Sequence, residues 1–150
     1  MKLLFCLFTL LFTSTCFAEE LHDYNAVKAA VLNGQLIRIV VDYNQCTILG
    51  PKGLVPNNAA AFTPNGIALM ASDKIGAYIL YFTMRDPWHP LQAVYQYGTY
   101  ILSNDNTLTI TFTVLNAADY KPFDEKGIVD CKMNEGAHIF INNNLPMAAN

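Results

Sequence analysis

The sequence predicts an α+β domain in which one N-terminal helix packs on a mostly antiparallel, curved sheet of five to seven strands, barrel-like in its most closed form. Three observations support this fold class. One early segment has apolar residues at helical spacing, most later segments alternate between apolar and polar residues, and turn residues separate them. We expect one domain over residues 19–150, long enough for one hydrophobic core, with a loose tail from Asn142 to Asn150.

The predicted helix covers Leu21 to Asn33. Asp23 near its start suits the helix dipole, and Gly34 is a typical residue just beyond a helix end. The apolar residues recur every three or four positions, so they share one face that packs on the sheet. These residues are Leu21, Tyr24, Val27, Ala30 and Val31.

The first predicted strand, Leu36 to Tyr43, alternates and is therefore half-buried. Arg38 and Asp42 share its polar face, where they can pair in solvent. The next segment, Gly50 to Gly66, is rich in proline and glycine. We expect it to be a long loop of modest functional weight, without a phosphate-binding motif.

Two further strands, Ile67 to Ser72 and Ile75 to Met84, are predicted on either side of a turn at Asp73 and Lys74. The second of them is apolar on both faces, which predicts a strand that is covered on both sides.

A hairpin of Leu91 to Leu102 and Leu108 to Leu115 follows. Its second strand alternates between four threonines that face water and four apolar residues that face the core. The threonines are Thr107, Thr109, Thr111 and Thr113, and the core residues are Leu108, Ile110, Phe112 and Val114. Lys121 to Val129 is polar and turn-like, and Ala137 to Ile141 supplies the last strand.

Residues Met1 to Ala18 have the pattern of a secretory signal peptide that is cleaved after Ala18. Lys2 forms the positive start, and Leu3 to Phe12 forms an apolar run too short to cross a bilayer. An uncleaved anchor and a lipoprotein modified at Cys16 are the alternatives. Export through the secretory pathway leads to the periplasm or to full secretion, and we expect the mature form not to span a membrane.

The predicted signal peptide determines which cysteines remain in the mature protein. Cys6 and Cys16 leave with the signal peptide, and Cys46 and Cys131 remain. Two cysteines in an oxidising compartment permit one intramolecular pair, so we expect a Cys46–Cys131 disulfide that closes most of the mature chain into a loop. A catalytic thiol and a pair of metal ligands are the rival interpretations. Neither cysteine lies in a Cys-x-x-Cys motif, and no clustered histidines complete a zinc site.

The charge pattern excludes several classes of partner. The formal net charge is −3 and becomes one unit more negative when Lys2 is removed. Basic residues are few and scattered, which disfavours binding to nucleic acid or to anionic lipid. No cofactor or metal site is predicted, and the expected partner is a protein whose identity the sequence does not give.

One segment carries the weak candidates for a functional site, namely Asp86, Trp88 and His89 beside Pro87. A carboxylate and an imidazole three residues apart on a rigid turn can form a polar pair, and Trp88 can wall a pocket. No nucleophile motif accompanies them, so we predict no catalytic residue. Five tyrosines are expected to be sheet core rather than a ligand platform: Tyr78, Tyr81, Tyr95, Tyr97 and Tyr100.

Several short motifs occur in a recognisable order along the chain. They are Leu32-x-Gly34, the strand Leu36 to Tyr43, Cys46, the segment Tyr95 to Tyr100, Leu115-Asn116-x-x-x-Tyr120 and Cys131. This order resembles the VirK family of small exported bacterial proteins, from Tyr24 to Ile141, although the family commonly has Asp where this chain has Asn116. The resemblance implies export, a shared architecture and an association with virulence or host interaction. It transfers no catalytic residue.

Three functions follow as hypotheses. The first is a disulfide-bonded, non-enzymatic accessory protein that acts by surface binding to a host or envelope partner. The second is a carrier of a small apolar ligand, which needs an enclosed cavity of about 300 Å³ or more. The third is a hydrolase that uses Asp86 and His89, which requires the two side chains to meet in a concave, partly buried site.

Overall fold

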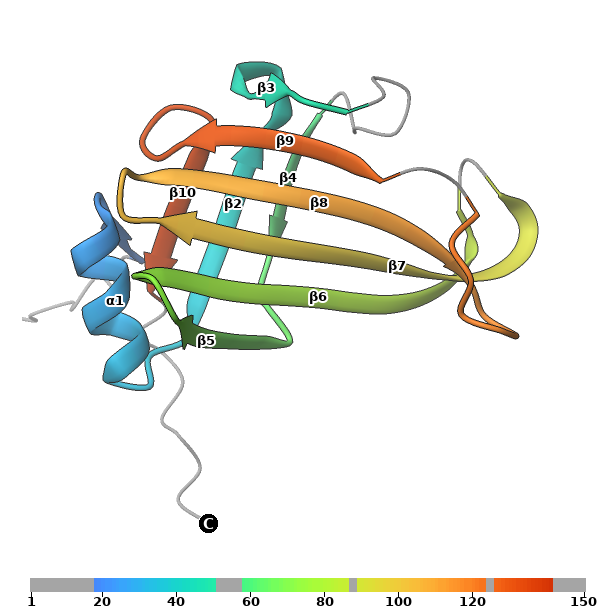
Figure 1. The fold of residues 1–150 in the computed structure, drawn as a ribbon, viewed down its shortest axis with the longest axis horizontal. Coiled ribbons are helices and arrows are strands. Elements are labelled where there is room, and N and C mark those ends of the chain that lie inside the picture. The colour runs from blue at the N-terminus through green and yellow to red at the C-terminus, as the bar shows by residue number, and fades with distance from the viewer. Residues whose placement is uncertain (1–17, 51–57, 87–88, 124–125, 142–150) are drawn as a thin grey trace, which may run out of the picture.

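The computed structural model describes residues 18–50, 58–86, 89–123 and 126–141. Over these residues the chain forms one α-helix, one short 3-10 helix and ten strands in two antiparallel sheets (Figure 1). The predicted α+β class with antiparallel pairing is confirmed. The expected single sheet of five to seven strands is wrong, and the two sheets are not closed into a barrel. The predicted signal peptide before Ala18 and the predicted tail lie outside the described residues.

The helix α1 (Tyr24–Leu32) follows directly on a short strand. Asp23 caps it, because its side chain accepts a hydrogen bond of 2.8 Å from the Ala26 N–H. Gly34 has a φ of +67°, the left-handed conformation that suits the residue after a helix end. The predicted start at Leu21 is wrong, because Leu21 belongs to β1 (Glu19–Leu21), where its backbone pairs with another strand.

The four-stranded sheet has the order β1-β10-β2-β4, built from β10 (Ala137–Ile141), β2 (Ile37–Asp42) and β4 (Ala59–Phe62) beside β1. The predicted alternation in β2 is confirmed, since Ile37, Ile39 and Val41 on its core face are at most 3% exposed. Asp42 accepts hydrogen bonds from Asn44 and Gln45. These bonds lower the pKa of Asp42, with the Gln45 side chain as the largest cause.

The six-stranded sheet has the order β3-β9-β8-β7-β6-β5. Its strands are β3 (Thr47–Ile48), β9 (Gly127–Lys132), β8 (Thr107–Asn116), β7 (Pro90–Ser103), β6 (Lys74–Arg85) and β5 (Gly66–Met70). The hairpin β7–β8 and the β5–β6 turn are therefore confirmed. The strands of the two sheets cross steeply, and the four-stranded sheet lies behind the six-stranded one in Figure 1.

Two segments expected to be irregular contain strands. The predicted loop Gly50 to Gly66 contains β4, whose Ala-rich sequence pairs with β2, while residues 51–57 lie outside the described residues. The predicted turn Lys121 to Val129 contains the first half of β9, which pairs with β8. In both places a neighbouring strand supplies the backbone hydrogen bonds that short sequence patterns do not reveal.

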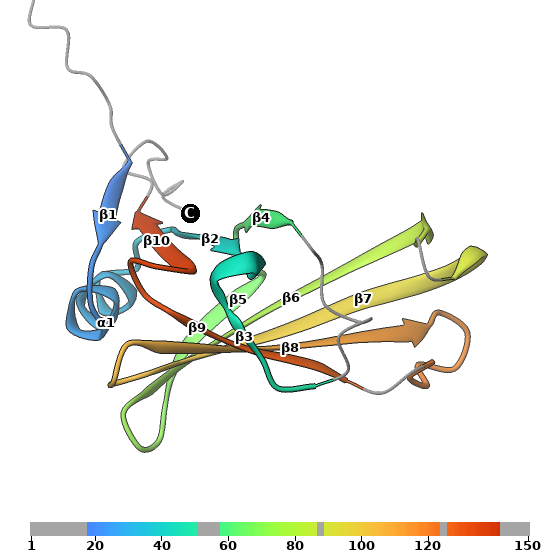
Figure 2. The ribbon, with the colours of Figure 1, turned by 90° about the horizontal axis from the view of Figure 1, so that it is seen from above.

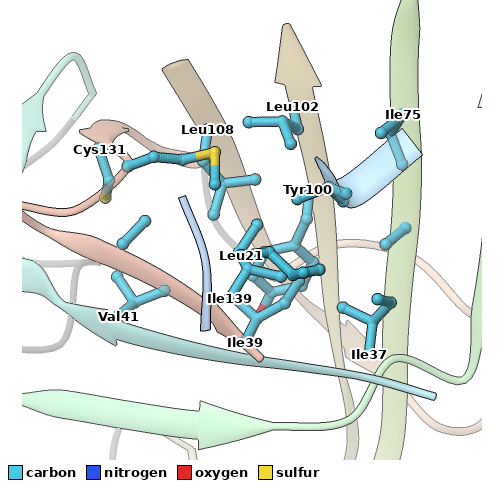
Figure 3. Packing of buried hydrophobic residues seen from close by; sticks show 14 of the residues in the cluster. Leu21, Ile37, Ile39, Val41, Ile75, Tyr100, Leu102, Leu108, Cys131 and Ile139 are labelled. Carbon is cyan, nitrogen blue, oxygen red and sulfur yellow. The ribbon is translucent and has the colours of Figure 1, made fainter. Parts of the chain in front are cut away.

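The hydrophobic core lies between α1 and the two sheets (Figure 3). Phe62 packs on Tyr100 with ring centres 4.3 Å apart, and Tyr43 meets Phe112 edge to face at 5.4 Å. Burial raises the pKa of Tyr43 and Tyr100, so both hydroxyls stay protonated. This interior holds a cavity of about 10 Å³, at most the room of one water molecule.

The predicted disulfide is present, with the Sγ atoms of Cys46 and Cys131 2.05 Å apart and a sequence separation of 85. Cys46 follows η1 (Tyr43–Gln45), where the chain passes from β2 in one sheet to β3 in the other. Cys131 lies in β9 and is fully buried. The bond therefore fixes the crossing between the two sheets.

Candidate functional site

One end of the six-stranded sheet extends beyond the four-stranded sheet. β6, β7 and β8 continue past β4 on the side away from α1 (Figure 2). We call this extension the far half and define it by its paired segments Tyr78–Arg85, Pro90–Thr99 and Thr111–Asn116. Its inner face continues the core side of the sheet, and over its outer face the described part of the chain places no second sheet.

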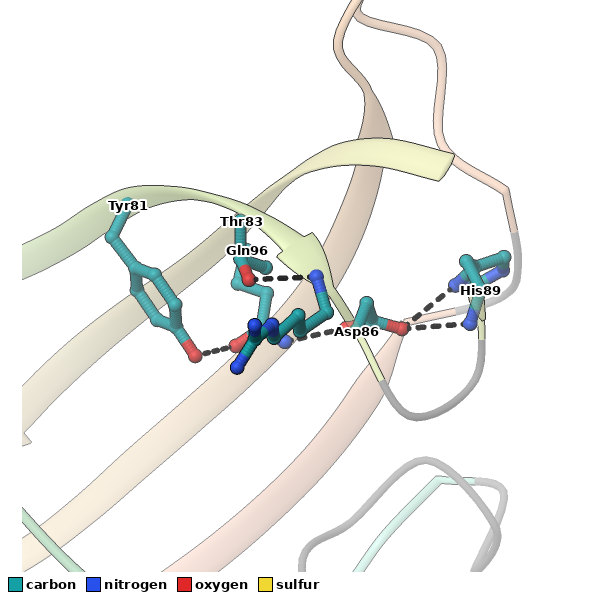
Figure 4. A network of polar contacts seen from close by, with 6 residues as sticks. Tyr81, Thr83, Asp86, His89 and Gln96 are labelled. Carbon is teal, nitrogen blue, oxygen red and sulfur yellow. Dashed lines mark hydrogen bonds and ion pairs between the residues drawn. The ribbon is translucent and has the colours of Figure 1, made fainter. Parts of the chain in front are cut away.

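A polar cluster lies at the inner face, centred on Asp86, which is 1% exposed. Asp86 Oδ1 accepts the His89 backbone N–H at 3.0 Å and lies 3.0 Å from His89 Nδ1. Gln96 donates to Asp86 Oδ2, and the Tyr81 hydroxyl donates to Gln96 Oε1 (Figure 4). The cluster of Tyr81, Asp86, His89 and Gln96 thus joins β6, the following turn and β7.

The strand pairing brings these side chains together. Tyr81 pairs directly with Gln96, so both point to the inner face. Burial raises the pKa of Tyr81, and the nearby Asp86 carboxylate raises it further. The ring of His89 stacks on Phe123 with centres 4.3 Å apart, which ties the turn to the segment after β8.

The structure therefore joins two of the three predicted site residues. Asp86 and His89 are in contact and largely buried, as a hydrolase would require, whereas Trp88 lies outside the described residues. Sequence reasoning missed Tyr81 and Gln96. The alternation of β7 does point to Gln96, because this residue shares a strand face with Val94 and Tyr100, which are both buried. A polar residue at such a position needs a buried partner.

The contacts of Asp86 hold the end of β6 to the first part of β7. Its carboxylate contacts the backbone N–H and the imidazole of His89 and the side-chain amide of Gln96, so it joins the end of β6 to two residues near the start of β7. A carboxylate–imidazole pair is also the arrangement that holds a general base in one tautomer. These contacts support a structural role for the pair, and they are compatible with proton transfer at His89.

The outer face of the far half gathers aromatic and aliphatic side chains that alternate with the inner-face residues. We call this surface the aromatic face, and it consists of Tyr78, Leu80, Phe82, Tyr95, Tyr97, Leu115 and Tyr120. Tyr95 is its centre, since its ring lies 5.6 Å from both Phe82 and Tyr120. Phe82 and Tyr120 are 53% and 63% exposed, so the face is open to a partner.

Charge divides the outer face of the sheet into two halves. The near half carries Lys74, Asp130 and Lys132, and Asp130 accepts a hydrogen bond from Thr109. The aromatic face contains no charged residue. Uncharged, aromatic-rich surface with a polar surround is typical of protein-binding sites.

Three sequence predictions about side-chain exposure fail on the six-stranded sheet. β6 was expected to be covered on both sides, yet Phe82 and Met84 are more than half exposed, because both point to the outer face, where no second sheet lies over them within the described residues. Of the five tyrosines expected in the core, only Tyr100 is buried. In contrast, Thr113 was expected in water and is 9% exposed, since Tyr97 is its cross-strand partner.

The other two histidines lie at the opposite end of the fold. His138 on β10 lies 2.6 Å from Glu20 on β1, and His22 lies 3.0 Å from Asn134. Both contacts therefore fasten the segment Glu20–His22 to β10 and the turn before it. The searched part of the chain contains no cluster of three metal-ligating side chains. Among the described residues, no helix combines the length and hydrophobicity needed to cross a membrane.

Comparison with known proteins bears on this architecture. A family model described as VirK protein matches residues 20–120, which include α1, β2, the polar cluster and the whole aromatic face. The chain belongs to the VirK family. This VirK family member is also similar to the crystal structure of a VirK family protein from Legionella pneumophila. The TM-score is 0.72 and the identity 25%, over 81% of this chain and 98% of that one. No curated protein sequence matches.

Proposed function

We propose that this VirK protein is an exported, virulence-associated accessory protein that has no enzymatic activity and binds a host or envelope protein through the aromatic face. The observation that carries the proposal is the uncharged, exposed aromatic surface on an otherwise polar sheet. Membership of the VirK family supports the association with virulence. The Cys46–Cys131 disulfide supports the export, because such bonds persist in oxidising compartments.

The chemistry of the face favours a protein partner. Tyrosine and phenylalanine supply large contact areas with few rotatable bonds, and the tyrosine hydroxyls can bond to a partner backbone. Tyr120 stacks on Tyr95 with ring planes 15° apart, which fixes the exposed ring before any partner arrives. A preorganised aromatic cluster is the usual composition of a binding hot spot.

The cavity between α1 and the two sheets gives no support to the ligand-carrier hypothesis. A small ligand needs about 300 Å³ or more, and the space between α1 and the sheets holds about 10 Å³. The hydrolase hypothesis retains one favourable observation, the buried contact between Asp86 and His89. Turnover of a substrate that stops when His89 is replaced by Gln in a folded protein would overturn the non-enzymatic part of the proposal.

Export has a direct test. The mature protein is expected to appear outside the cytoplasm with Glu19 as its first residue, because a signal peptidase would cut after Ala18. Mass spectrometry of the fractionated protein measures both its location and its N-terminus. A protein that stays in the cytoplasm with Met1 intact would contradict export.

Binding through the aromatic face also has a test. Replacing Tyr97 and Tyr120 together by Ser removes two rings without touching the core. Capture of the partner from envelope or host extract is expected to fall at least tenfold, about 1.4 kcal/mol or more, since aromatic hot spots carry much of the binding free energy. Quantitative mass spectrometry of the captured proteins measures the change.

The matched control is Leu32→Ser, which removes an exposed apolar side chain at the end of α1 and outside the aromatic face. It is expected to capture the same proteins in the same amounts as the wild type. If the tyrosine double variant and the control behave alike, the aromatic face is not the binding surface.

A further inference from the structure

The outer edge of β6 changes character along its length. Its first part, Lys74 to Tyr78, pairs with β5, while Ile79 to Arg85 pairs with β7 on one side only (Figure 1). Within the described ranges, no strand occupies the other side of Ile79 to Arg85. This stretch is therefore an open strand edge on the far half of the sheet.

Asn65 marks where the pairing stops. Its backbone N–H donates to the Tyr78 carbonyl at 2.8 Å, and its side-chain oxygen accepts the Leu80 N–H at 2.6 Å. The backbone groups of alternate residues in a strand point to the same edge. The Leu80 carbonyl, both backbone groups of Phe82 and the Met84 N–H therefore point outward, away from β7.

The open edge lacks the usual protection against strand pairing. Natural edges are guarded by charges, prolines, bulges or very short strands. Ile79 to Met84 contains neither charge nor proline, and three of its apolar side chains, those of Leu80, Phe82 and Met84, are 42%, 53% and 61% exposed. The irregularity at Thr83 and Arg85 concerns the pairing with β7, on the opposite side of the strand.

We propose that a second copy of this chain pairs with the open edge, antiparallel to it, about a two-fold axis at Phe82. This register places Phe82 opposite Phe82 of the second copy and Leu80 opposite Met84 of the second copy. The outward N–H and carbonyl groups then meet complementary groups, and the two six-stranded sheets become one. Because the axis is two-fold, each copy contributes the same strand edge to the contact.

Charge supports a second copy as the occupant. Arg85 is the only charged residue of the open edge, and in this register it stands opposite the uncharged Ile79 of the other copy. No like charges therefore face each other across the pair. The side chains of Leu80, Phe82 and Met84 from both copies share the outer face, so the two aromatic faces join into one surface. The pairing does not depend on the proposed partner binding.

A cysteine at the axis tests the register. In a hydrogen-bonded antiparallel pair the two Cα atoms are about 5.5 Å apart, within the range of a disulfide. The purified Phe82→Cys protein is therefore expected to form a covalent dimer on mild oxidation, seen by non-reducing electrophoresis. The matched control is Tyr78→Cys, on the same strand and face and similarly exposed. Position 78 lies four residues from the two-fold axis, so its Cα atom is roughly 27 Å from the same atom of the second copy.

Both variants keep the same native cysteines, so any cross-link through a native cysteine appears equally in the Phe82→Cys and Tyr78→Cys proteins. A Phe82→Cys dimer yield at least tenfold above that of Tyr78→Cys supports the proposal. Equal yields overturn it.

Opposite charges at the axis test the same contact without a covalent bond. Phe82→Lys and Phe82→Glu each place like charges opposite each other, so each protein alone is expected to sediment as a monomer while the wild type sediments as a dimer. An equimolar mixture of the two variants is expected to recover the dimer. A monomeric wild type, a dimeric Phe82→Lys protein or a mixture that stays monomeric would each overturn the proposal. Circular dichroism checks that both variants keep the wild-type fold.

Discussion

Loss of the Cys46–Cys131 disulfide is expected to lower the free energy of unfolding by about 4 kcal/mol. The bond joins residues 85 apart in sequence, so it removes a large part of the conformational entropy of the unfolded chain. It also fixes the passage from β2 in one sheet to β3 in the other. Urea denaturation of the Cys46→Ala, Cys131→Ala double variant, followed by circular dichroism, measures the difference.

Reduction provides the control for this prediction. Wild-type protein treated with a thiol reductant is expected to fall to the stability of the double variant, and the reductant is expected to leave the double variant unchanged. This comparison separates the cross-link from the side chains themselves, since Cys131 is fully buried and its replacement alters packing. Wild-type stability that does not respond to complete reduction would contradict a stabilising disulfide.

Replacement of Asp86 by Ala is expected to destabilise the protein by about 3 kcal/mol. The change removes the common acceptor of the His89 backbone N–H, the His89 ring and the Gln96 amide, and it leaves them without that partner in a buried place. The free energy of unfolding from urea titrations is the measurement.

Asp119→Ala is the matched control for Asp86. Asp119 also accepts a backbone N–H two residues on and pairs with Lys121, but its side chain is 47% exposed. Its removal is expected to cost less than about 1 kcal/mol, because water replaces the lost contacts. Equal losses of unfolding free energy in the Asp86→Ala and Asp119→Ala variants would show that the polar cluster stabilises the protein no more than an exposed carboxylate does.

Local sequence patterns predicted the elements whose two faces differ. The helix, β2, the β7–β8 hairpin and β10 all have alternating or helical spacing, and each was found close to its predicted bounds. The patterns failed for β4 and the start of β9, whose residues carry little alternation and become strands because a neighbour pairs with them. They also failed to show that the strands divide into two crossing sheets, since local spacing does not say which strands are neighbours.

The candidate site was predictable only in part, for the same reason. Asp86 and His89 are three residues apart, so their contact follows from a local turn. Tyr81 and Gln96 reach them through the pairing of β6 with β7, which the sequence does not specify. The aromatic face was missed because an apolar strand in the interior and an apolar strand at an open end have the same composition. What distinguishes them is whether another layer of the fold covers that face of the sheet, and among the described residues none covers the outer face.

The pairing of β1 with β10 determines where a tag or a linker is best attached to this protein. Glu19 lies directly opposite Ile141, so the described fold begins and ends at one corner, beside α1 and away from the far half (Figure 1). An affinity tag or a surface linkage attached at this corner therefore starts far from the aromatic face and from the open edge of β6. The same adjacency makes the fold a natural subject for circular permutation, with new termini opened in the β5–β6 turn at Asp73.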